Sequence, residues 1–171
     1  MTEPGALTRG TFTFLFSDIE GSTRLEQAVG RDRYAELRER QRAILREASD
    51  AHGGIEQGTE GDSFFIAFHE APDAIEAAVA AQRALAAEPW PDDATVKVRM
   101  GVHTGGAEQS GESLVGLGIN RAARIAALAH GGQILASSLV RDQLVDRPGV
   151  VDLGAGEGDD AFQVAEPAVD V

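Results

Sequence analysis

Two aspartates in this sequence stand beside short turns, where an extended apolar segment stops. Asp18 ends the apolar run of "FLFSDIEGSTRL", residues 14–25, and small and hydroxyl-bearing residues follow it. Asp62 lies in the Gly-rich centre of "IEQGTEGDSFFIAF", residues 55–68. Mg²⁺ and Mn²⁺ prefer oxygen ligands and usually take one or two carboxylates, with water and substrate phosphate as the remaining ligands. If the two segments are neighbours, Asp18 and Asp62 repel each other unless a cation lies between them, so the pair suggests a divalent metal site.

The turn after Asp18 has the composition of a phosphate-binding turn. Residues 19–23, "IEGST", can present successive backbone N–H groups at the N-terminus of a helix, where the helix dipole also favours an anion. Ordinary structure explains the same residues, because Asp before Gly, Ser and Thr is a turn and N-cap signature and Asp after Gly is common at a hairpin tip. From spacing alone, the metal-and-phosphate hypothesis and the purely structural one both stay open.

The hydrophobic pattern predicts the elements that would position these residues. Residues 11–17, "TFTFLFS", alternate and then become continuously apolar, which indicates a strand buried mainly on both faces. Helical spacing follows over about residues 23–51, as one long helix or as two short ones with a break near Gly30. Residues 55–68 have two extended flanks around a Gly-rich centre, which indicates a hairpin with its tip near residues 60–62.

The rest of the pattern completes an α+β fold. We expect a helix over residues 72–87, a strand over 95–105, a helix over 118–132, a short strand "QILAS", a short helix "SLVRDQL" and two candidate strands, "GVVDL" and "AFQVA". This order fits a ferredoxin-like βαββαβ sandwich with helices on one side of the sheet. The first strand and the hairpin are neighbours in that arrangement, so Asp18 and Asp62 converge.

Composition limits the class of protein. The chain has 171 residues, of which 43% are hydrophobic, so we expect one domain over residues 1–171 with a core of about 11–145, and C-terminal strands and an acidic tail over 148–171. No cysteine, no long apolar run and no signal-like N-terminus are present, which predicts a cytoplasmic protein without disulfides. The net charge of -13 argues against nucleic acid and anionic membranes as partners. A nucleotide remains compatible where metal ions and local donors reverse the field in one cleft.

A third motif, "GINRAARI", gives the chain a family resemblance. The chain resembles the class III nucleotidyl cyclase catalytic domain in its bacterial form. Three blocks occur in the order and at the spacing of that family: "FLFSDIEGST", "GDSFFIAF", and "VRMGVHTG" followed by "GINRAARIA". The resemblance covers about residues 11–139. It implies an α+β cyclase fold and a reaction in which the ribose 3'-hydroxyl attacks the α-phosphorus of a nucleoside triphosphate and releases pyrophosphate.

The resemblance also assigns roles to single residues. By position it implies that Asp18, the backbone of Ile19 and Asp62 bind two Mg²⁺ or Mn²⁺ ions per active site. It implies that Asn120 orients the ribose and that Arg124 stabilises the transition state. The remaining implied nucleotide contacts are the triphosphate-holding turn Ile19, Glu20, Gly21, Ser22 and Thr23 and the base-reading positions Gly58 and Ser113.

Family members form the active site between two subunits, with the aspartates from one and the Asn/Arg pair from the other. The resemblance therefore implies a homodimer with two equivalent sites. Asn120 and Arg124 lie one helical turn apart, so both can face one ligand. Without the resemblance, each residue by itself is better explained as ordinary structure, Arg124 as a surface arginine on an amphipathic helix and Asn120 as a polar residue of its first turn.

The substrate base is left open by two departures from the family pattern. Adenine-selective members usually carry Lys four residues before the second metal aspartate, where this chain has Gly58, and Asp or Thr seven residues before the ribose-orienting Asn, where it has Ser113. A local shift could bring Gln57 or Glu60 into the base pocket. ATP remains the first candidate substrate because it is frequent in the family, as in an adenylate cyclase, while GTP and the pyrimidine triphosphates stay open.

The alternative function is a catalytically weak or inactive cyclase-like nucleotide-binding or dimerisation module. A diguanylate cyclase is disfavoured because no "GGDEF"-like turn occurs at the hairpin.

Overall fold

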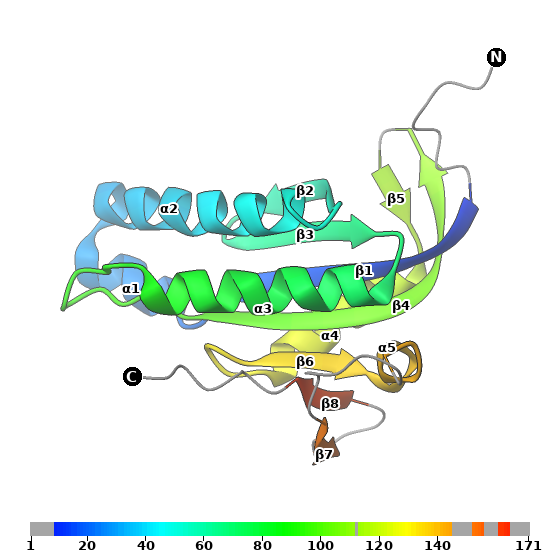
Figure 1. Ribbon diagram of the computed structural model, residues 1–171. Coiled ribbons are helices and arrows are strands. Elements are labelled where there is room, and N and C mark those ends of the chain that lie inside the picture. Colours follow the sequence, from blue (N-terminus) through cyan, green and yellow to red (C-terminus); the bar gives the residue numbers. More distant parts are fainter. Residues whose placement is uncertain (1–8, 112, 145–151, 156–160, 165–171) are drawn as a thin grey trace.

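A computed structural model of the protein describes residues 9–111, 113–144, 152–155 and 161–164. Within these residues eight strands form one sheet in the order β2-β3-β1-β4-β6-β8-β7, and β5 pairs with β4 (Figure 1). The strands are β1 (Arg9–Ile19), β2 (Ile55–Glu60), β3 (Ser63–Phe68), β4 (Val98–Ser110), β5 (Ser113–Val115), β6 (Ile134–Ser137), β7 (Asp152–Ala155) and β8 (Ala161–Val164). The helices are α1 (Ser22–Val29), α2 (Arg31–Asp50), α3 (Ala71–Ala87), α4 (Leu117–Leu128) and α5 (Ser138–Asp142).

Strand β1 runs between β3 and β4, antiparallel to both. Successive side chains of a strand point to opposite faces, and β1 is apolar on both of them. Leu15 and Ile19 belong to the larger core under α2 and α3, whereas Phe12 and Phe14 belong to a second core on the other face. The predicted two-sided burial of this strand is confirmed. Asp18 is therefore held near the end of a strand that neighbours fix on both edges.

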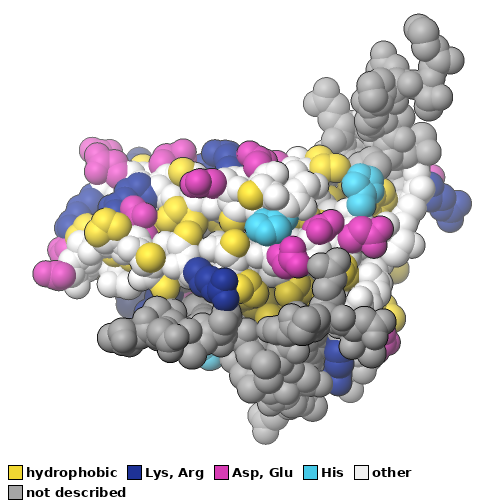
Figure 2. All heavy atoms as spheres, in the orientation of Figure 1, with side chains coloured by type: hydrophobic (Ala, Val, Ile, Leu, Met, Phe, Trp, Pro, Cys, Tyr) yellow, Lys and Arg dark blue, Asp and Glu magenta, His cyan; other side chains and the backbone are white. Residues whose placement is uncertain are grey.

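The helical segment after β1 is two helices and not one. Gly30, with φ of 87°, separates α1 from α2, so the expected break is confirmed. The buried residues of α2 include Tyr34, Leu37 and Leu45, spaced to face the sheet, and α3 buries its alanine-rich stripe beside them. Figure 2 shows the outer surface of this layer, over which acidic side chains and arginines are both spread.

The position of helix α4 shows that the expectation of helices on one side of the sheet was wrong. It packs on the face opposite to α2 and α3, against Phe14 and its neighbours (Figure 1). A Cβ at Gly101 of β4 would lie 2.4 Å from the carbonyl oxygen of Ala122 and 2.4 Å from the nitrogen of Ala126. The glycine thus lets α4 approach the sheet closely, and the sheet is covered on both faces. The ferredoxin-like α+β class itself is confirmed.

The remaining elements follow the sequence expectation with three main differences. Strand β4 ends at Ser110, five residues beyond the expected end at residue 105. Strand β5 was not predicted, and β7 begins at Asp152, so it overlaps only the end of "GVVDL". Residues 145–151, 156–160 and 165–171 lie outside the described residues, as does most of the expected acidic tail. The single-domain assignment stays a prediction. No helix in the described part of the chain is long and apolar enough to cross a membrane.

Candidate active site

The two predicted metal-binding aspartates meet at the end of β1. The backbone N–H of Ile19 donates a hydrogen bond to Oδ2 of Asp62, with 2.8 Å between the two atoms. This bond joins the residue after Asp18 to the tip of the β2–β3 hairpin. Segments that are distant in sequence therefore bring Asp18, Ile19 and Asp62 together, as the sequence predicted from the neighbouring positions of strand and hairpin.

Arg99 of β4 is bound to Asp18 in a bidentate ion pair. Its Nε donates to Oδ1 at 2.7 Å and its Nη2 donates to Oδ2 at 2.6 Å. The hydrogen bond and charge of Asp18, with smaller effects of Glu20 and Asp62, raise the pKa of Arg99 above its usual value against the opposing effect of burial. The guanidinium thus supplies the positive charge that the carboxylate needs at a partly buried position.

Sequence reasoning missed Arg99, because the signal that identifies it is the strand register. Asp18 and Arg99 are direct partners in the antiparallel β1–β4 ladder. Opposite charges at such facing positions are a standard cross-strand pair. Only the strand register identifies them as neighbours, and the register could not be derived from "VRMGVHTG" alone.

The ligand set here fits a magnesium or manganese ion that keeps external ligands. Among the residues that the structure describes, no group of three or more His, Cys, Asp or Glu side chains could hold a metal by itself. Two carboxylates and a backbone carbonyl at Ile19 are hard oxygen donors, too few for a closed cage. Such a set suits Mg²⁺ or Mn²⁺, which usually retain water and bind substrate phosphate in their other positions.

The turn between β1 and α1 leaves the start of the helix open. Gly21 adopts the left-handed conformation, with φ 63° and ψ 34°, and no side chain caps α1. The N–H groups of Ile19 and Glu20 already donate, to Asp62 and to the carbonyl oxygen of Lys97. Helix N-termini carry N–H groups without intrahelical acceptors. In the predicted turn, the N–H groups left available for an anion are therefore those of the last three residues, Gly21, Ser22 and Thr23.

Tyr34 of α2 lies next to both halves of this site. The side chain of Ser22 and the charge of Asp62 both act on its hydroxyl. Burial, followed by the negative charge of Asp62, raises the pKa of Tyr34 above its ordinary value. The phenol therefore stays protonated beside the start of α1.

A second group of predicted residues lines a separate cavity of about 340 Å³. A β-bulge between Glu56 and Gly58 inserts Gln57 as an extra residue in β2. The Oε1 atom of Gln57 accepts a hydrogen bond of 3.2 Å from the N–H of Leu114. The cavity is lined by Phe16, Gln57, Gly58, Thr59, Glu60, Ser63, Phe65, Ile119, Asn120 and Ala123.

The structure thus separates the predicted nucleotide contacts into two groups. Gly58 and Asn120 share the cavity, whereas Ser113 and Arg124 do not line it. Arg124 lies one turn after Asn120 on α4, and both side chains are exposed. Asp18 and Phe16 lie on the same face of β1, because they are two residues apart. The metal-binding end and the cavity therefore occur on the α4 side of the same strand.

His103, which belongs to the "GVHTG" motif, is placed as a buried structural residue. It lies four positions along β4 from Arg99, and its Nδ1 is 2.8 Å from the hydroxyl oxygen of Ser137. Burial, with a smaller effect of positively charged Arg121, lowers the pKa of His103 below its usual value. A neutral, hydrogen-bonded imidazole at this place indicates a structural role.

Comparison with curated proteins finds relatives of which this chain spans only a part. An uncharacterised protein of Mycobacterium tuberculosis is 37% identical over 151 residues, which cover 85% of this chain and 50% of that protein. A putative adenylate cyclase of Rhizobium meliloti is 30% identical over 156 residues, covering 89% of this chain and 27% of that protein. The chain thus spans half the length or less of these relatives. Comparison with models of known protein families finds no match.

Comparison with solved structures defines the class of the fold. An adenylyl cyclase from P. aeruginosa superposes with a TM-score of 0.77 at 20% identity, covering 96% of this chain and 98% of that one. An adenylate/guanylate cyclase/hydrolase from Silicibacter pomeroyi superposes with a TM-score of 0.73 at 26% identity, covering 91% and 95%. The chain has the fold of the class III nucleotidyl cyclase catalytic domain. The resemblance drawn from its motifs is confirmed.

Proposed function

We propose that this chain is a nucleotidyl cyclase domain that converts a nucleoside triphosphate to the 3',5'-cyclic nucleotide and pyrophosphate, with ATP as the first candidate substrate. The observation that carries the proposal is the meeting of Asp18, Ile19 and Asp62 beside the uncapped start of α1. Carboxylates for a divalent cation and free N–H groups for phosphate are both needed to bind a metal–triphosphate complex. We expect the protein to act in the cytoplasm.

Each site residue has a defined task in this reaction. Asp18, the Ile19 carbonyl and Asp62 would hold two divalent ions, which would acidify the ribose 3'-hydroxyl and neutralise phosphate charge. The N–H groups of Gly21, Ser22 and Thr23 hold the polyphosphate at the helix start, and Ile19 and Glu20 shape this turn. Arg99 balances the charge of Asp18, and a bound cation would compete with it for that carboxylate.

The second half of the site comes from another copy of the chain. Asn120 and Arg124 are both exposed and lie on one face of α4, so they are available to a partner subunit. In a homodimer, Asn120 orients the ribose, and Arg124 stabilises the charge that grows on the α-phosphoryl oxygens. A symmetric pair supplies two such sites.

The base of the nucleotide is recognised in the cavity next to the β-bulge at Gln57. Gly58 has no side chain and Ser113 does not line this cavity, whereas Gln57 and Glu60 line it together with Asn120. The Gln57 amide carries both a donor and an acceptor, so it can pair with the edge of either purine by rotation. This property supports Gln57 as a base contact and leaves the choice between ATP and GTP to measurement.

The alternative function is a nucleotide-binding or dimerisation module without cyclase activity. Two observations favour it: Arg99 already occupies both oxygens of Asp18, and Gly58 and Ser113 stand where the family's usual base readers would be. Such a module keeps the fold and the dimer surface but turns over no triphosphate.

Product analysis distinguishes the two functions. The purified protein is incubated with Mn²⁺ and each of ATP, GTP, CTP and UTP, and cyclic products are identified by mass spectrometry. We expect a product that disappears in Asp18→Asn and Arg124→Ala but persists in Asp50→Asn and Arg83→Ala, which replace exposed residues of α2 and α3. Mixing the two inactive variants should restore part of the activity if the sites are shared between subunits. A folded, dimeric protein that yields no product from any triphosphate supports the module instead.

A further inference from the structure

The hairpin tip that carries Asp62 has little support from the sheet. Strand β2 is the edge of the sheet, where β3 is its sheet neighbour, and nearly all its residues are exposed. The tip residue Gly61 is exposed and has a φ of 58°, a left-handed turn conformation that glycine adopts without strain. Contacts beyond the β2–β3 ladder are therefore needed to fix where Asp62 lies.

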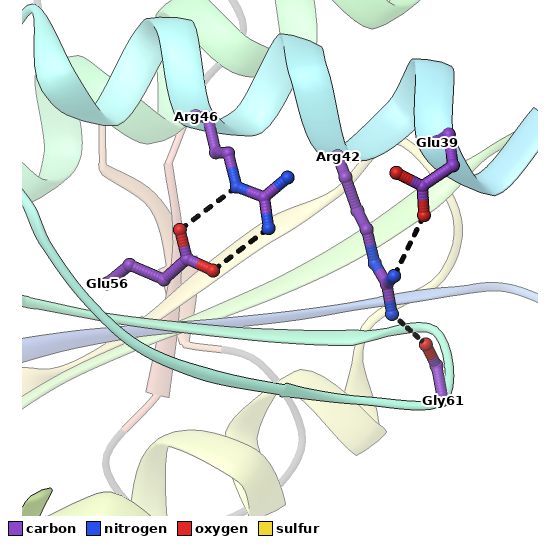
Figure 3. Close-up of polar contacts among 5 residues, drawn as sticks. All are labelled: Glu39, Arg42, Arg46, Glu56 and Gly61. Atoms are coloured by element: carbon purple, nitrogen blue, oxygen red, sulfur yellow. Dashed lines mark hydrogen bonds and ion pairs between the residues drawn. The ribbon is translucent and has the colours of Figure 1, made fainter.

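Helix α2 provides these contacts through two arginines (Figure 3). Arg46 binds Glu56 near the base of the hairpin, with its Nε and Nη2 each 3.0 Å from a carboxylate oxygen. Arg42, one turn earlier, donates from Nη2 to the carbonyl oxygen of Gly61 at 2.5 Å. Its Nη1 donates to Glu39 at 2.9 Å, which orients the guanidinium from within the same helix.

The two arginine contacts differ in burial and in position. The Arg42 side chain is 14% exposed, whereas that of Arg46 is 44% exposed. Arg42 binds the residue directly before Asp62, and Asp62 in turn accepts the hydrogen bond from Ile19. The tip is thus tied to α2 on one side and to the end of β1 on the other. Arg46 holds the same hairpin five residues before its tip.

We propose that Arg42 is a positioning residue that holds Asp62 in the geometry required to bind the catalytic cation. The inference rests on the proposed metal role of Asp62. Groups that orient a metal ligand without touching the metal typically contribute a factor of about 10 to 100 in metal affinity. Arg42 acts through one backbone carbonyl, so the lower end of that range, about tenfold, is expected.

The sign of the effect separates positioning from electrostatics. A guanidinium near a cation site repels the cation, so removal of its charge alone would strengthen metal binding. Loss of the bond to Gly61 would weaken it. A weaker site in Arg42→Met, which lacks the charge, therefore reports the position of Asp62. Arg42→Lys keeps the charge but lacks the planar guanidinium that binds Glu39 and Gly61 together.

The test measures Mn²⁺ binding to the full chain by the loss of the free-ion electron paramagnetic resonance signal, with the metal alone. We expect the Mn²⁺ dissociation constant to rise about tenfold in Arg42→Met and Arg42→Lys. Arg46→Met is the matched control, because it removes the other arginine contact of the same helix and hairpin. Its dissociation constant should stay within about twofold of wild type, since a partly exposed ion pair contributes little.

Each outcome decides one of the two ideas. Unchanged Mn²⁺ affinity in both Arg42 variants would overturn the positioning role while leaving the metal site in place. Equal weakening in Arg46→Met would also overturn it, because the effect would then reflect general loosening of the hairpin. Wild-type protein that binds no Mn²⁺, or whose binding survives Asp62→Asn, would refute the metal role itself and the inference with it.

Discussion

Replacing Arg99 with methionine tests whether the Asp18 site is built for a cation. The change removes two charge-assisted hydrogen bonds, of 2.7 and 2.6 Å, and leaves Asp18 beside Asp62 without compensation. Hydrogen bonds to charged groups contribute about 1.5–3 kcal/mol to stability. The side chains of Arg99 and Asp18 are 27% and 20% exposed, so solvent screens part of this energy and about 2 kcal/mol is expected.

Thermal unfolding with and without Mn²⁺ is the assay. For a chain of this size, a loss of about 2 kcal/mol lowers the Tm by about 4–8 °C. A cation that binds only the folded protein stabilises it, and it stabilises the variant more because no guanidinium competes for the carboxylate. The difference in Tm between wild type and Arg99→Met should therefore shrink by half or more when saturating Mn²⁺ is added.

A surface pair of the same geometry provides the control. Arg33 binds Asp93 with two hydrogen bonds, but the two side chains are 41% and 68% exposed and lie in another region. Arg33→Met should cost less than about 1 kcal/mol, and Mn²⁺ should not alter that cost. The reasoning fails if Arg99→Met is as stable as wild type without metal, or if Mn²⁺ leaves its deficit unchanged.

Three further predictions follow from single contacts. Gly101→Ala should destabilise the fold by at least about 1–3 kcal/mol in urea unfolding, because its Cβ would overlap α4, whereas Gly106→Ala in the same strand meets nothing within 4 Å and should be near neutral. Burial lowers the pKa of His103, so the folded protein resists a proton that the unfolded chain accepts. The associated stability is complete above the ordinary pKa of about 6.5 and decreases as the pH falls from there toward the lowered value. His103→Gln should flatten this decrease when unfolding midpoints at pH 8 and pH 5 are compared. Gln57→Ala should lower kcat/KM by about 5- to 150-fold, mainly through KM, for each purine triphosphate that the protein uses, because the amide can pair with either purine. An unchanged KM for all of them would remove Gln57 as a base contact.

Local signals in the sequence were sufficient for the strand and hairpin that carry the two aspartates. The alternation over residues 11–17, the glycines around Asp62 and the break at Gly30 each report backbone conformation within a few residues. The side of the sheet that α4 covers was predicted wrongly. It depends on Gly101, whose missing side chain makes room only once two distant segments are packed together. The register between strands also depends on the packing of segments that are distant in sequence, and Arg99 was missed for that reason.

The β-bulge at Gln57 shows how such a non-local feature changes a functional prediction. Counting back from Asp62 along the chain selects Gly58 as the base-reading position. An extra residue in β2 shifts the alternation of side chains, so the residue before Gly58 also faces the cavity that holds Asn120. The pairing of β2 with β3 is regular from Gly58 to Glu60, and the bulge lies at Gln57, five residues before the proposed metal ligand Asp62. The count therefore reaches Gly58 through an unbroken strand but passes over Gln57, which lines the same cavity. The missing lysine does not by itself imply that the base goes unread.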